Sequence, residues 1–293
     1  MGLKKPPSSS LEALHQGEFW FTELHAPGTG ITFRVRRVLH WARTPFQELA
    51  LVETEDMGRA LFLDGTVQFT ERDEFIYHEM LVHVPLCIHP RPRRVLIVGG
   101  GDGGCVREAL LHPQVEEVTL VEIDGEVVEA CRRHIPSVSS RLGDPRVRLL
   151  IQDGVKFMKE NRGAFDVIIV DSTDPVGMAS PLTQAPFFRT AQEALTPQGL
   201  YVAQSQGPLF DGREIARIAR AARKVFRHAA HFLAPTPTYP GGLWSFLLAT
   251  RGPKNPAALE PRPMPRGAKT RYYSTGVHKA AFVLPPFVQD FVR

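Results

Sequence analysis

The stretch "VLIVGGGDGGCVREAL", residues 95–110, joins an apolar strand to a helix through a glycine-rich loop. Gly99, Gly101 and Gly104 fit the G-x-G-x-x-G spacing of nucleotide-binding loops, whose backbone N–H groups usually meet a pyrophosphate. Asp102 stands in the middle of this loop. Two like charges about 4 Å apart cost on the order of 4 kcal/mol at an effective dielectric constant near 20. The loop therefore disfavours a dinucleotide and favours a nucleoside that carries positive charge.

The segments on either side of this loop predict an α/β protein with a separate small sheet. From Arg93 onward, apolar strands alternate with amphipathic helices, which predicts a parallel sheet covered on both faces. Upstream, residues 18–70 alternate as strands, with a turn at Asp64–Gly65 between two apolar runs. Residues 71–89 change to helical spacing, and their acidic first turn is typical of a helix N-terminus. We predict a flexible lead over 1–17, a β domain over 18–70 and a larger domain over 71–293.

Composition excludes several classes of protein. The chain has 293 residues, and 35 basic against 31 acidic residues leave a net charge of +4. No basic run with interleaved aromatic residues indicates a nucleic-acid groove, and the apolar runs are too short to span a membrane. The three cysteines form no C-x-x-C pair, so we predict reduced thiols and a cytoplasmic protein. Cys105, inside the loop, is interpreted as a small residue that begins a helix rather than as a nucleophile.

Acidic residues follow strand after strand, at the edge of the sheet where ligands of such folds bind. Glu122 lies 23 residues after Gly99, where an acid can accept both hydroxyls of a ribose in NAD, a nucleoside or S-adenosylmethionine alike. Asp153 either accepts from an adenine amino group or caps the helix that follows. Asp171 and Asp174 flank a tight turn in "DSTDPVG". They could bind a metal, cap the turn, or hold an amine and take its proton.

Eight segments, in this order along nearly the whole chain, carry a family resemblance. They are "LFLDGTVQFTERDEFIYHEML" (61–81), "VLIVGGGDGG" (95–104), "LVEID" (120–124), "DPRV" (144–147), "FDVIIVDSTDPVG" (165–177), "VAQSQ" (202–206), "PTYPGGLWSF" (237–246) and "RYYSTGVHKAAFVLP" (271–285). The sequence resembles the polyamine aminopropyltransferases, the spermidine synthase family. That resemblance implies a Rossmann-like, methyltransferase-type doubly wound sheet after the small antiparallel β domain. It also implies transfer of the aminopropyl group of decarboxylated S-adenosylmethionine to putrescine or a related amine, giving spermidine and 5′-methylthioadenosine.

The resemblance also implies roles for individual residues, with no prosthetic group and no metal. Asp171 is expected to accept the proton of the attacking amine. The decarboxylated donor is expected to contact Gln47, Gly99, Gly101, Asp102, Glu122, Asp153 and Gly154. The amine acceptor is expected to contact Tyr77, His78, Asp171, Asp174, Gln204 and Tyr239. Family members assemble through the N-terminal β domain, so a homodimer or homotetramer is implied.

The expected reaction makes one physical demand on this site. A primary amine with a pKa of about 10.4 arrives protonated, and a carboxylate with an ordinary pKa of about 3.9 is a weak base for it. Burial beside a sulfonium lowers the pKa of the amine, while desolvation raises that of Asp171. The two values then approach each other, which makes proton transfer feasible near neutral pH.

Two departures from the family pattern and three competing functions bear on this interpretation. Residues 178–183, "MASPLT", replace part of the family's lid, and Leu209 stands where an aromatic residue is common. The smaller Leu209 suggests acceptors longer than putrescine.

An S-adenosylmethionine methyltransferase shares the fold, but the methionine carboxylate would meet Asp102. A non-catalytic polyamine-binding protein would keep the fold without turnover, and a nicotinamide dehydrogenase would bring a pyrophosphate against Asp102.

Overall fold

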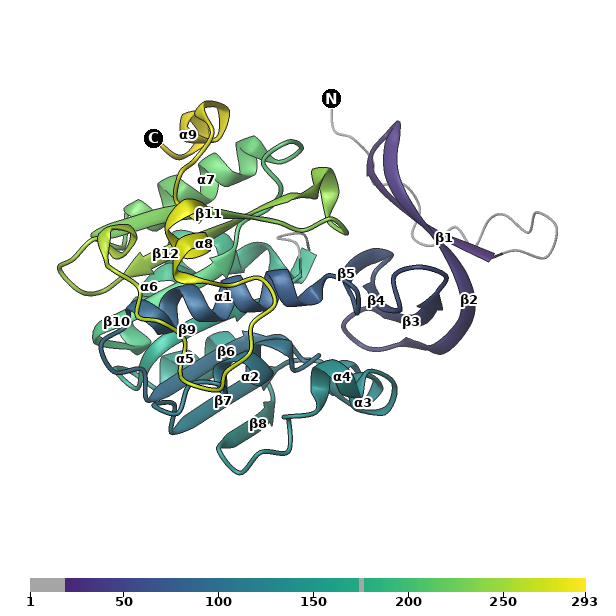
Figure 1. Cartoon of the computed structure of the whole chain (residues 1–293), viewed down its shortest axis with the longest axis horizontal. Coiled ribbons are helices and arrows are strands. Elements are labelled where there is room, and N and C mark those ends of the chain that lie inside the picture. Colours follow the sequence, from purple (N-terminus) through teal and green to yellow (C-terminus); the bar gives the residue numbers. More distant parts are fainter. Residues whose placement is uncertain (1–18, 174–176) are drawn as a thin grey trace.

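The first of two sheets is built from the N-terminal part of the chain (Figure 1). A computed structural model of the chain describes residues 19–173 and 177–293, without the side chains of 177–179. The predicted lead over 1–17 therefore lies outside the described residues, as does Asp174. This five-stranded sheet is antiparallel throughout, in the order β1-β2-β3-β4-β5. Its strands are β1 (Phe19–Ala26), β2 (Thr29–Arg43), β3 (Glu48–Thr54), β4 (Arg59–Leu63) and β5 (Thr66–Thr70).

The turn predicted at Asp64–Gly65 joins β4 to β5. Both residues have positive φ angles, 49° at Asp64 and 79° at Gly65. A two-residue hairpin turn with positive φ at both positions matches the twist of the strands that it connects, and the Asp-Gly pair suits it. The local sequence thus determines this turn without help from packing.

The second sheet has seven strands in the order β11-β12-β10-β9-β6-β7-β8. They are β6 (Arg94–Gly99), β7 (Glu117–Glu122), β8 (Val147–Ile151), β9 (Phe165–Asp171), β10 (Leu195–Gln204), β11 (His228–Pro235) and β12 (Leu243–Thr250). The doubly wound α/β class predicted from the sequence is confirmed. The prediction of a wholly parallel sheet is wrong, because β12 pairs antiparallel with both β10 and β11. A short loop rather than a helix joins β11 to β12, and only a parallel connection needs a crossover helix.

Helices cover both faces of this sheet, as predicted. One face packs against α1 (Glu74–Ile88) and α2 (Gly104–Ala109), and the other against α5 (Gly154–Glu160), α6 (Ala185–Ala194) and α7 (Gly212–Arg223). The remaining helices are α3 (Gly125–His134), α4 (Pro136–Ser139), α8 (Thr275–Ala281) and α9 (Pro286–Val292), with 3-10 turns at Gly177–Thr183, Pro240–Gly242 and Pro256–Ala258. None of the helices in the described ranges is long and apolar enough to cross a membrane.

The two sheets share an apolar interface. Leu49, Leu51 and Leu61 of the small sheet pack with Val127 and Cys131 of α3. Helix α3 follows β7, whose carboxyl end carries Glu122. This packing therefore places the small sheet beside the edge where the acidic strand ends gather.

Helix α1 differs from the sequence-based expectation. The spacing of Phe75, Met80, Leu81 and Val84 predicts one buried face, yet all of its residues are buried except Phe75 and Ile76, which are half-buried. The helix leads from β5 of the small sheet along a face of the large sheet, and Figure 1 shows the C-terminal segment passing over it. Its polar side chains consequently have to find partners inside the protein.

Candidate active site

A cavity of about 1320 Å³ lies between the small sheet and the carboxyl ends of the large sheet's strands. Twelve of the thirteen site residues predicted from the sequence line it: Gln47, Tyr77, His78, Gly99, Gly101, Asp102, Glu122, Asp153, Gly154, Asp171, Gln204 and Tyr239. The thirteenth, Asp174, lies outside the described residues. Residues of the small domain form much of the remaining wall, which the position of the strand ends does not by itself predict.

Carboxylates dominate the charge of the cavity wall. Six carboxylate side chains line it: Glu23, Asp64, Asp102, Glu122, Asp153 and Asp171. No lysine or arginine occurs among its lining residues in the described part of the chain. A cavity of this composition favours cations and disfavours a ligand carboxylate or phosphate.

The glycine loop brings β6 and β9 close together. Gly99 and Gly100 have φ angles of 79° and 68°, in the left-handed region that glycine tolerates best. A Cβ atom at Gly99 would collide with the backbone carbonyl of Asp171, and one at Gly100 would lie 2.8 Å from Asp171 Oδ2. The glycines thus let the loop pass directly beside this carboxylate.

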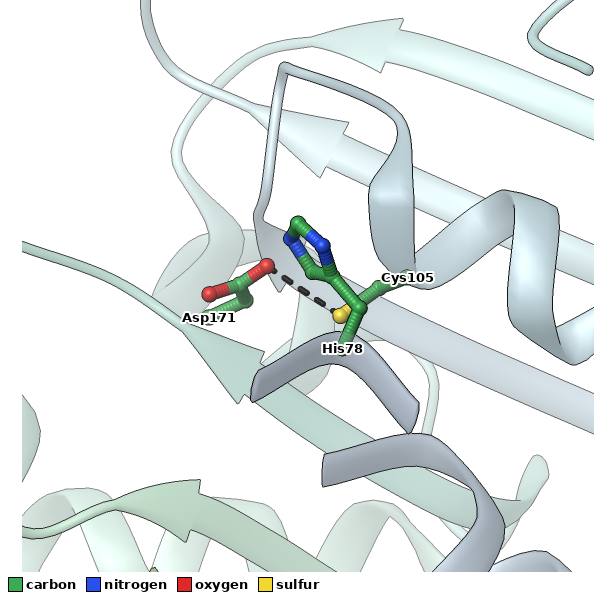
Figure 2. A group of neighbouring side chains, drawn as sticks. All are labelled: His78, Cys105 and Asp171. Atoms are coloured by element: carbon green, nitrogen blue, oxygen red, sulfur yellow. Dashed lines mark hydrogen bonds between the residues drawn. The ribbon is translucent and has the colours of Figure 1, made fainter. Parts of the chain in front are cut away.

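Asp171 is held by two side chains from different helices. Tyr77 of α1 donates its hydroxyl to Asp171 Oδ1 at 2.8 Å, and Cys105 of α2 donates its thiol to Oδ2 at 3.1 Å (Figure 2). Burial, followed by the nearby charge of Asp102, raises the pKa of Asp171. A raised pKa makes Asp171 a stronger base, as proton transfer from an amine requires. The contact of Cys105 could not be expected, because the sequence places it 66 residues from Asp171.

Asp102 sits at the turn into α2 and is buried. Its Oδ1 accepts from the backbone N–H of Gly104 at 2.7 Å and lies 3.4 Å from His78 Nε2. Burial acts to raise the pKa of Asp102, but the charge of His78 and these hydrogen bonds outweigh it and hold the pKa below its ordinary value. The structure therefore keeps an anion in the loop.

His78 lies between two carboxylates. Its Nδ1 lies 2.6 Å from Glu74 Oε2, one turn back on α1, and its Nε2 faces Asp102. Arg107 of α2 donates to both oxygens of Glu74, at 3.0 and 2.8 Å. The sequence indicates Glu74 only as a first-turn acid and suggests no role for Arg107.

His78, Cys105 and Asp171 also raise the question of a metal. Their potential ligand atoms lie within 4.8 Å of one another. Burial and then the charge of Asp171 raise the pKa of the Cys105 thiol well above its ordinary value, and the thiol donates to Asp171. Both nitrogens of His78 already face carboxylates. A metal would need the thiolate and a free imidazole nitrogen, so this set fits a hydrogen-bond cluster better than a metal site.

Glu122 marks the opposite end of the cavity. Its two oxygens accept from the backbone N–H groups of Gly101, at 3.1 Å, and Asp124, at 3.0 Å. Burial raises the pKa of Glu122 to about 7. Gln47 of the small sheet donates to Asp124 Oδ2 at 2.9 Å, so this contact joins the two sheets beside Glu122.

Asp153 and Gln204 lie at the ends of β8 and β10. Asp153 Oδ1 caps α5 by accepting from Val155 and Lys156, at 2.7 and 3.1 Å. The helix-capping role is thus present, while the side chain also lines the cavity. Gln204 donates weakly to the Ser172 carbonyl, at 3.4 Å, and accepts from the backbone of Gln206.

Tyr239 reaches the cavity from the loop between β11 and β12. Its hydroxyl donates to the Gln68 carbonyl of β5, and its ring packs edge-on against Tyr77. Asp73 fixes this loop by accepting from the backbone and hydroxyl of Thr238, at 2.8 and 2.5 Å. Asp73 is a further residue whose partner, far away in the sequence, could not be predicted.

The departures from the family pattern also have places in the structure. Pro181 and Leu182 of the altered segment line the cavity. Leu209 is 62% exposed and is not among the described lining residues. Leu209 therefore does not narrow the cavity, and the use of acceptors longer than putrescine stays a prediction.

The fold and the site together define a Rossmann-like transferase with a cavity for cationic ligands. Residues 74–257 match the family model described as the spermine/spermidine synthase domain, and residues 19–71 match that of the spermidine synthase tetramerisation domain. The chain belongs to the spermine/spermidine synthase family. The family resemblance inferred from the sequence is thereby confirmed.

Individual relatives cover almost the whole chain. It is 48% identical to a polyamine aminopropyltransferase of Moorella thermoacetica over 94% of this chain and 96% of that protein. It is 44% identical to the polyamine aminopropyltransferase of Bacillus subtilis over 94% and 99%. The crystal structure of spermidine synthase from Thermotoga maritima superposes with a TM-score of 0.89, at 35% identity and 97% coverage of both chains. A spermidine synthase in complex with the transition-state analogue AdoDATO gives a TM-score of 0.90 at the same identity and coverage.

Proposed function

We propose that this chain is a polyamine aminopropyltransferase that uses decarboxylated S-adenosylmethionine as donor and putrescine or a related amine as acceptor. The observation that carries the donor assignment is the cavity wall with six carboxylates and, among its described lining residues, no lysine or arginine. Decarboxylated S-adenosylmethionine carries only a sulfonium and an ammonium. The intact donor of a methyltransferase would also bring a carboxylate, and among the described lining residues there is no lysine or arginine to receive it.

The reaction forms one bond and breaks one. The amine nitrogen attacks the aminopropyl carbon, a C–N bond forms, and the C–S electron pair returns to sulfur as 5′-methylthioadenosine leaves. The proton of the attacking amine goes to Asp171. The raised pKa of this carboxylate brings it closer to an amine whose own pKa is lowered beside the sulfonium.

The hydrogen bonds around Asp171 support its role as the base. Tyr77 and Cys105 each donate to one oxygen, so the carboxylate is held in one orientation while its remaining lone pairs face the cavity. Holding nitrogen and carbon near 3–3.5 Å in line recovers much of the entropy cost of bringing two reactants together. Glu122 would accept from the ribose hydroxyls, and Asp102 would face the cationic chain of the donor.

Release of 5′-methylthioadenosine tests the proposal directly. The purified protein is given decarboxylated S-adenosylmethionine with putrescine, cadaverine, agmatine or spermidine in separate reactions. Turnover with at least one amine is expected, and the ratio of the kcat/KM values identifies the preferred acceptor. Absence of turnover with all four amines, while the donor still binds in calorimetry, would favour a non-catalytic polyamine-binding protein.

Two further properties belong to this proposal. The match of residues 19–71 to a tetramerisation domain supports a homo-oligomer, either a homodimer or a homotetramer. Sedimentation of the purified protein distinguishes these states. The cytoplasmic location stays a prediction from the sequence, supported by three buried free cysteines.

A further inference from the structure

A chain of buried charged groups leads away from the cavity behind His78. Its members alternate in sign: Asp102, His78, Glu74, Arg107 and Glu108. All of them are buried except Arg107, which is half-buried. The proposed mechanism uses only Asp102 and His78 from this chain, so Glu74 is a buried ionisable group that still needs an explanation.

Hydrogen-bond geometry determines the protonation of His78. Glu74 accepts from Arg107 at both of its oxygens, and Asp102 accepts from the Gly104 N–H. Both acids are therefore acceptors, and both nitrogens of His78 face one of them. An imidazole that donates at both nitrogens is the imidazolium cation. Burial opposes the charge, but Asp102 and Glu74 outweigh it and raise the pKa of His78 well above its ordinary value.

We propose that Glu74 is a positioning residue that holds His78 as a cation against Asp102 and Asp171, and so keeps Asp171 in its proton-accepting form. This inference rests on the proposed function, because it assigns Asp171 as the base. It also changes the expected role of His78. A histidine that donates at both nitrogens cannot accept a hydrogen bond from a substrate ammonium, so His78 acts on the carboxylates rather than on the amine.

Groups from four parts of the fold face His78 and Asp171. Glu74 and Tyr77 come from α1, Asp102 and Cys105 from the glycine loop and α2, and Asp171 itself from β9. Behind them, Arg107 of α2 contacts Glu74, and Tyr239 of the β11–β12 loop contacts Tyr77. Asp102 raises the pKa of Asp171, whereas the positive charge of His78 lowers it. Among these groups, His78 is the only cation directly beside the two carboxylates. Loss of its charge would leave the Asp102–Asp171 repulsion uncompensated.

A close contact with Gly104 supports the positioning role. A Cβ atom at this first residue of α2 would collide with the His78 ring at three of its atoms. Only glycine lets α2 begin beneath the imidazole while its N–H reaches Asp102. The third glycine of the sequence motif is thus needed for the His78 position, besides any role in binding a nucleoside.

The test is the pH dependence of the reaction in the Glu74→Gln variant. Glutamine keeps the size of the side chain but removes the charge that stabilises the imidazolium. Neutral His78 no longer lowers the pKa of Asp171, so the acidic limb of the kcat/KM profile should move to higher pH by about one unit or more. The Glu74→Asp variant keeps the negative charge, so its acidic limb should lie closer to that of wild type than the limb of Glu74→Gln does.

A matched control lies on the same helix. Glu79 is also buried on α1, but it accepts three backbone N–H groups from Arg271, Tyr272 and Tyr273 and is not among the residues that line the cavity. The Glu79→Gln variant should lower the melting temperature and leave the acidic limb in place. A purely structural role of Glu74 would give this same pattern in both variants.

Nitrogen chemical shifts of His78 provide a readout that does not depend on turnover. The Glu74→Gln spectra are compared with wild type from pH 5 to 9, and His78→Gln identifies the resonance. We expect an imidazolium in wild type at pH 7 and a neutral ring in Glu74→Gln. A neutral His78 in wild type, or superimposable pH profiles, would overturn the proposal. Failure of the proposed function would instead abolish 5′-methylthioadenosine release in wild type and leave the His78 titration intact.

Discussion

The two ends of the cavity hold their carboxylates by different means. At the donor end, Glu122 and Asp153 accept from backbone N–H groups of the segments that follow β6, β7 and β8. At the transfer end, Asp171 accepts from the side chains of Tyr77 and Cys105. Backbone donors follow from the path of the loop, whereas side-chain donors depend on how distant helices pack.

This difference separates the expected consequences of mutation. A change from acid to amide at the donor end removes the negative charge proposed to face the ligand and leaves the reacting groups unchanged. A change at the transfer end alters the charge and orientation of the reacting groups. Donor-end variants should therefore act mainly on KM and donor affinity, and transfer-end variants mainly on kcat.

The largest effect is expected for Asp171→Asn. An amide cannot take the amine's proton, so kcat should fall by about 10²–10⁴-fold. The donor should still bind within about threefold of its wild-type affinity, since Glu122 and the glycine loop are unchanged. Single-turnover release of 5′-methylthioadenosine and calorimetry measure the two quantities. A kcat within tenfold of wild type would remove Asp171 from the role of base.

Glu122→Gln tests the donor end. A hydrogen bond to a charged group contributes about 1.5–3 kcal/mol, so the affinity for the donor should fall by roughly 10–100-fold. The kcat at saturating donor should stay within a few-fold of wild type. An equal loss in kcat would show that the two ends of the cavity do not act separately.

Glu122→Gln should also change how the free energy of unfolding depends on pH. The pKa of Glu122 is about 7 in the folded protein, against an ordinary value of 4.5. Between these values the folded state keeps a proton that the unfolded state has lost, so stability falls as pH rises through this window, by up to about 3 kcal/mol. Urea unfolding of the ligand-free proteins measures the free energy of unfolding at pH 5 and pH 8. Its fall between these pH values should be smaller in Glu122→Gln than in wild type. Equal falls in both proteins would mean that Glu122 is already ionised at pH 5.

Asp73→Asn tests whether binding of the amine acceptor depends on the hydrogen bonds that fix the loop carrying Tyr239. Asp73 ties Thr238 and therefore the Tyr239 loop to the start of α1. Its amide would mismatch at least one donor, at a cost of about 1–3 kcal/mol. We expect the acceptor KM to rise roughly three- to tenfold with unchanged donor affinity. A change confined to melting temperature would make the anchor structural only.

The smallest effect is expected for Asp153→Asn. Asparagine caps a helix about as well as aspartate, so the melting temperature should hardly change. Loss of the charge on an acceptor from the adenine amino group should weaken donor binding by roughly threefold. Calorimetry with the donor decides the point, and an unchanged affinity would leave Asp153 as a helix cap alone.

Much of the site could be predicted from local sequence. Four acidic or glycine-rich positions lie at or just after the end of a predicted strand: the glycine loop, Glu122, Asp153 and Asp171. Parallel strands bring their carboxyl ends to one edge of the sheet. Twelve of the thirteen predicted residues line one cavity, but the family resemblance rather than a local pattern indicated five of them: Gln47, Tyr77, His78, Gln204 and Tyr239. The negative charge within the glycine loop also followed from the residue types alone, because Asp102 interrupts it.

The partners of these residues could not be predicted. Glu74, Arg107 and Cys105 carry no local pattern that points to His78 or Asp171. The spacing in helix α1 predicts burial on one face only, yet nearly all of the helix is buried. Burial depends on which segments pack around a helix, and that is decided by long-range contacts rather than by spacing.

The sequence by itself thus determined the fold class, the turn at Asp64–Gly65 and the acidic edge of the sheet, because each depends on backbone geometry or residue type within a few positions. The tertiary structure alone decided the antiparallel direction of β12, the acids that face His78 and the hydrogen bonds of Asp171. Those properties arise where α1, α2 and β9 meet, and a charge acquires its partner and its pKa only when burial has removed water from around it.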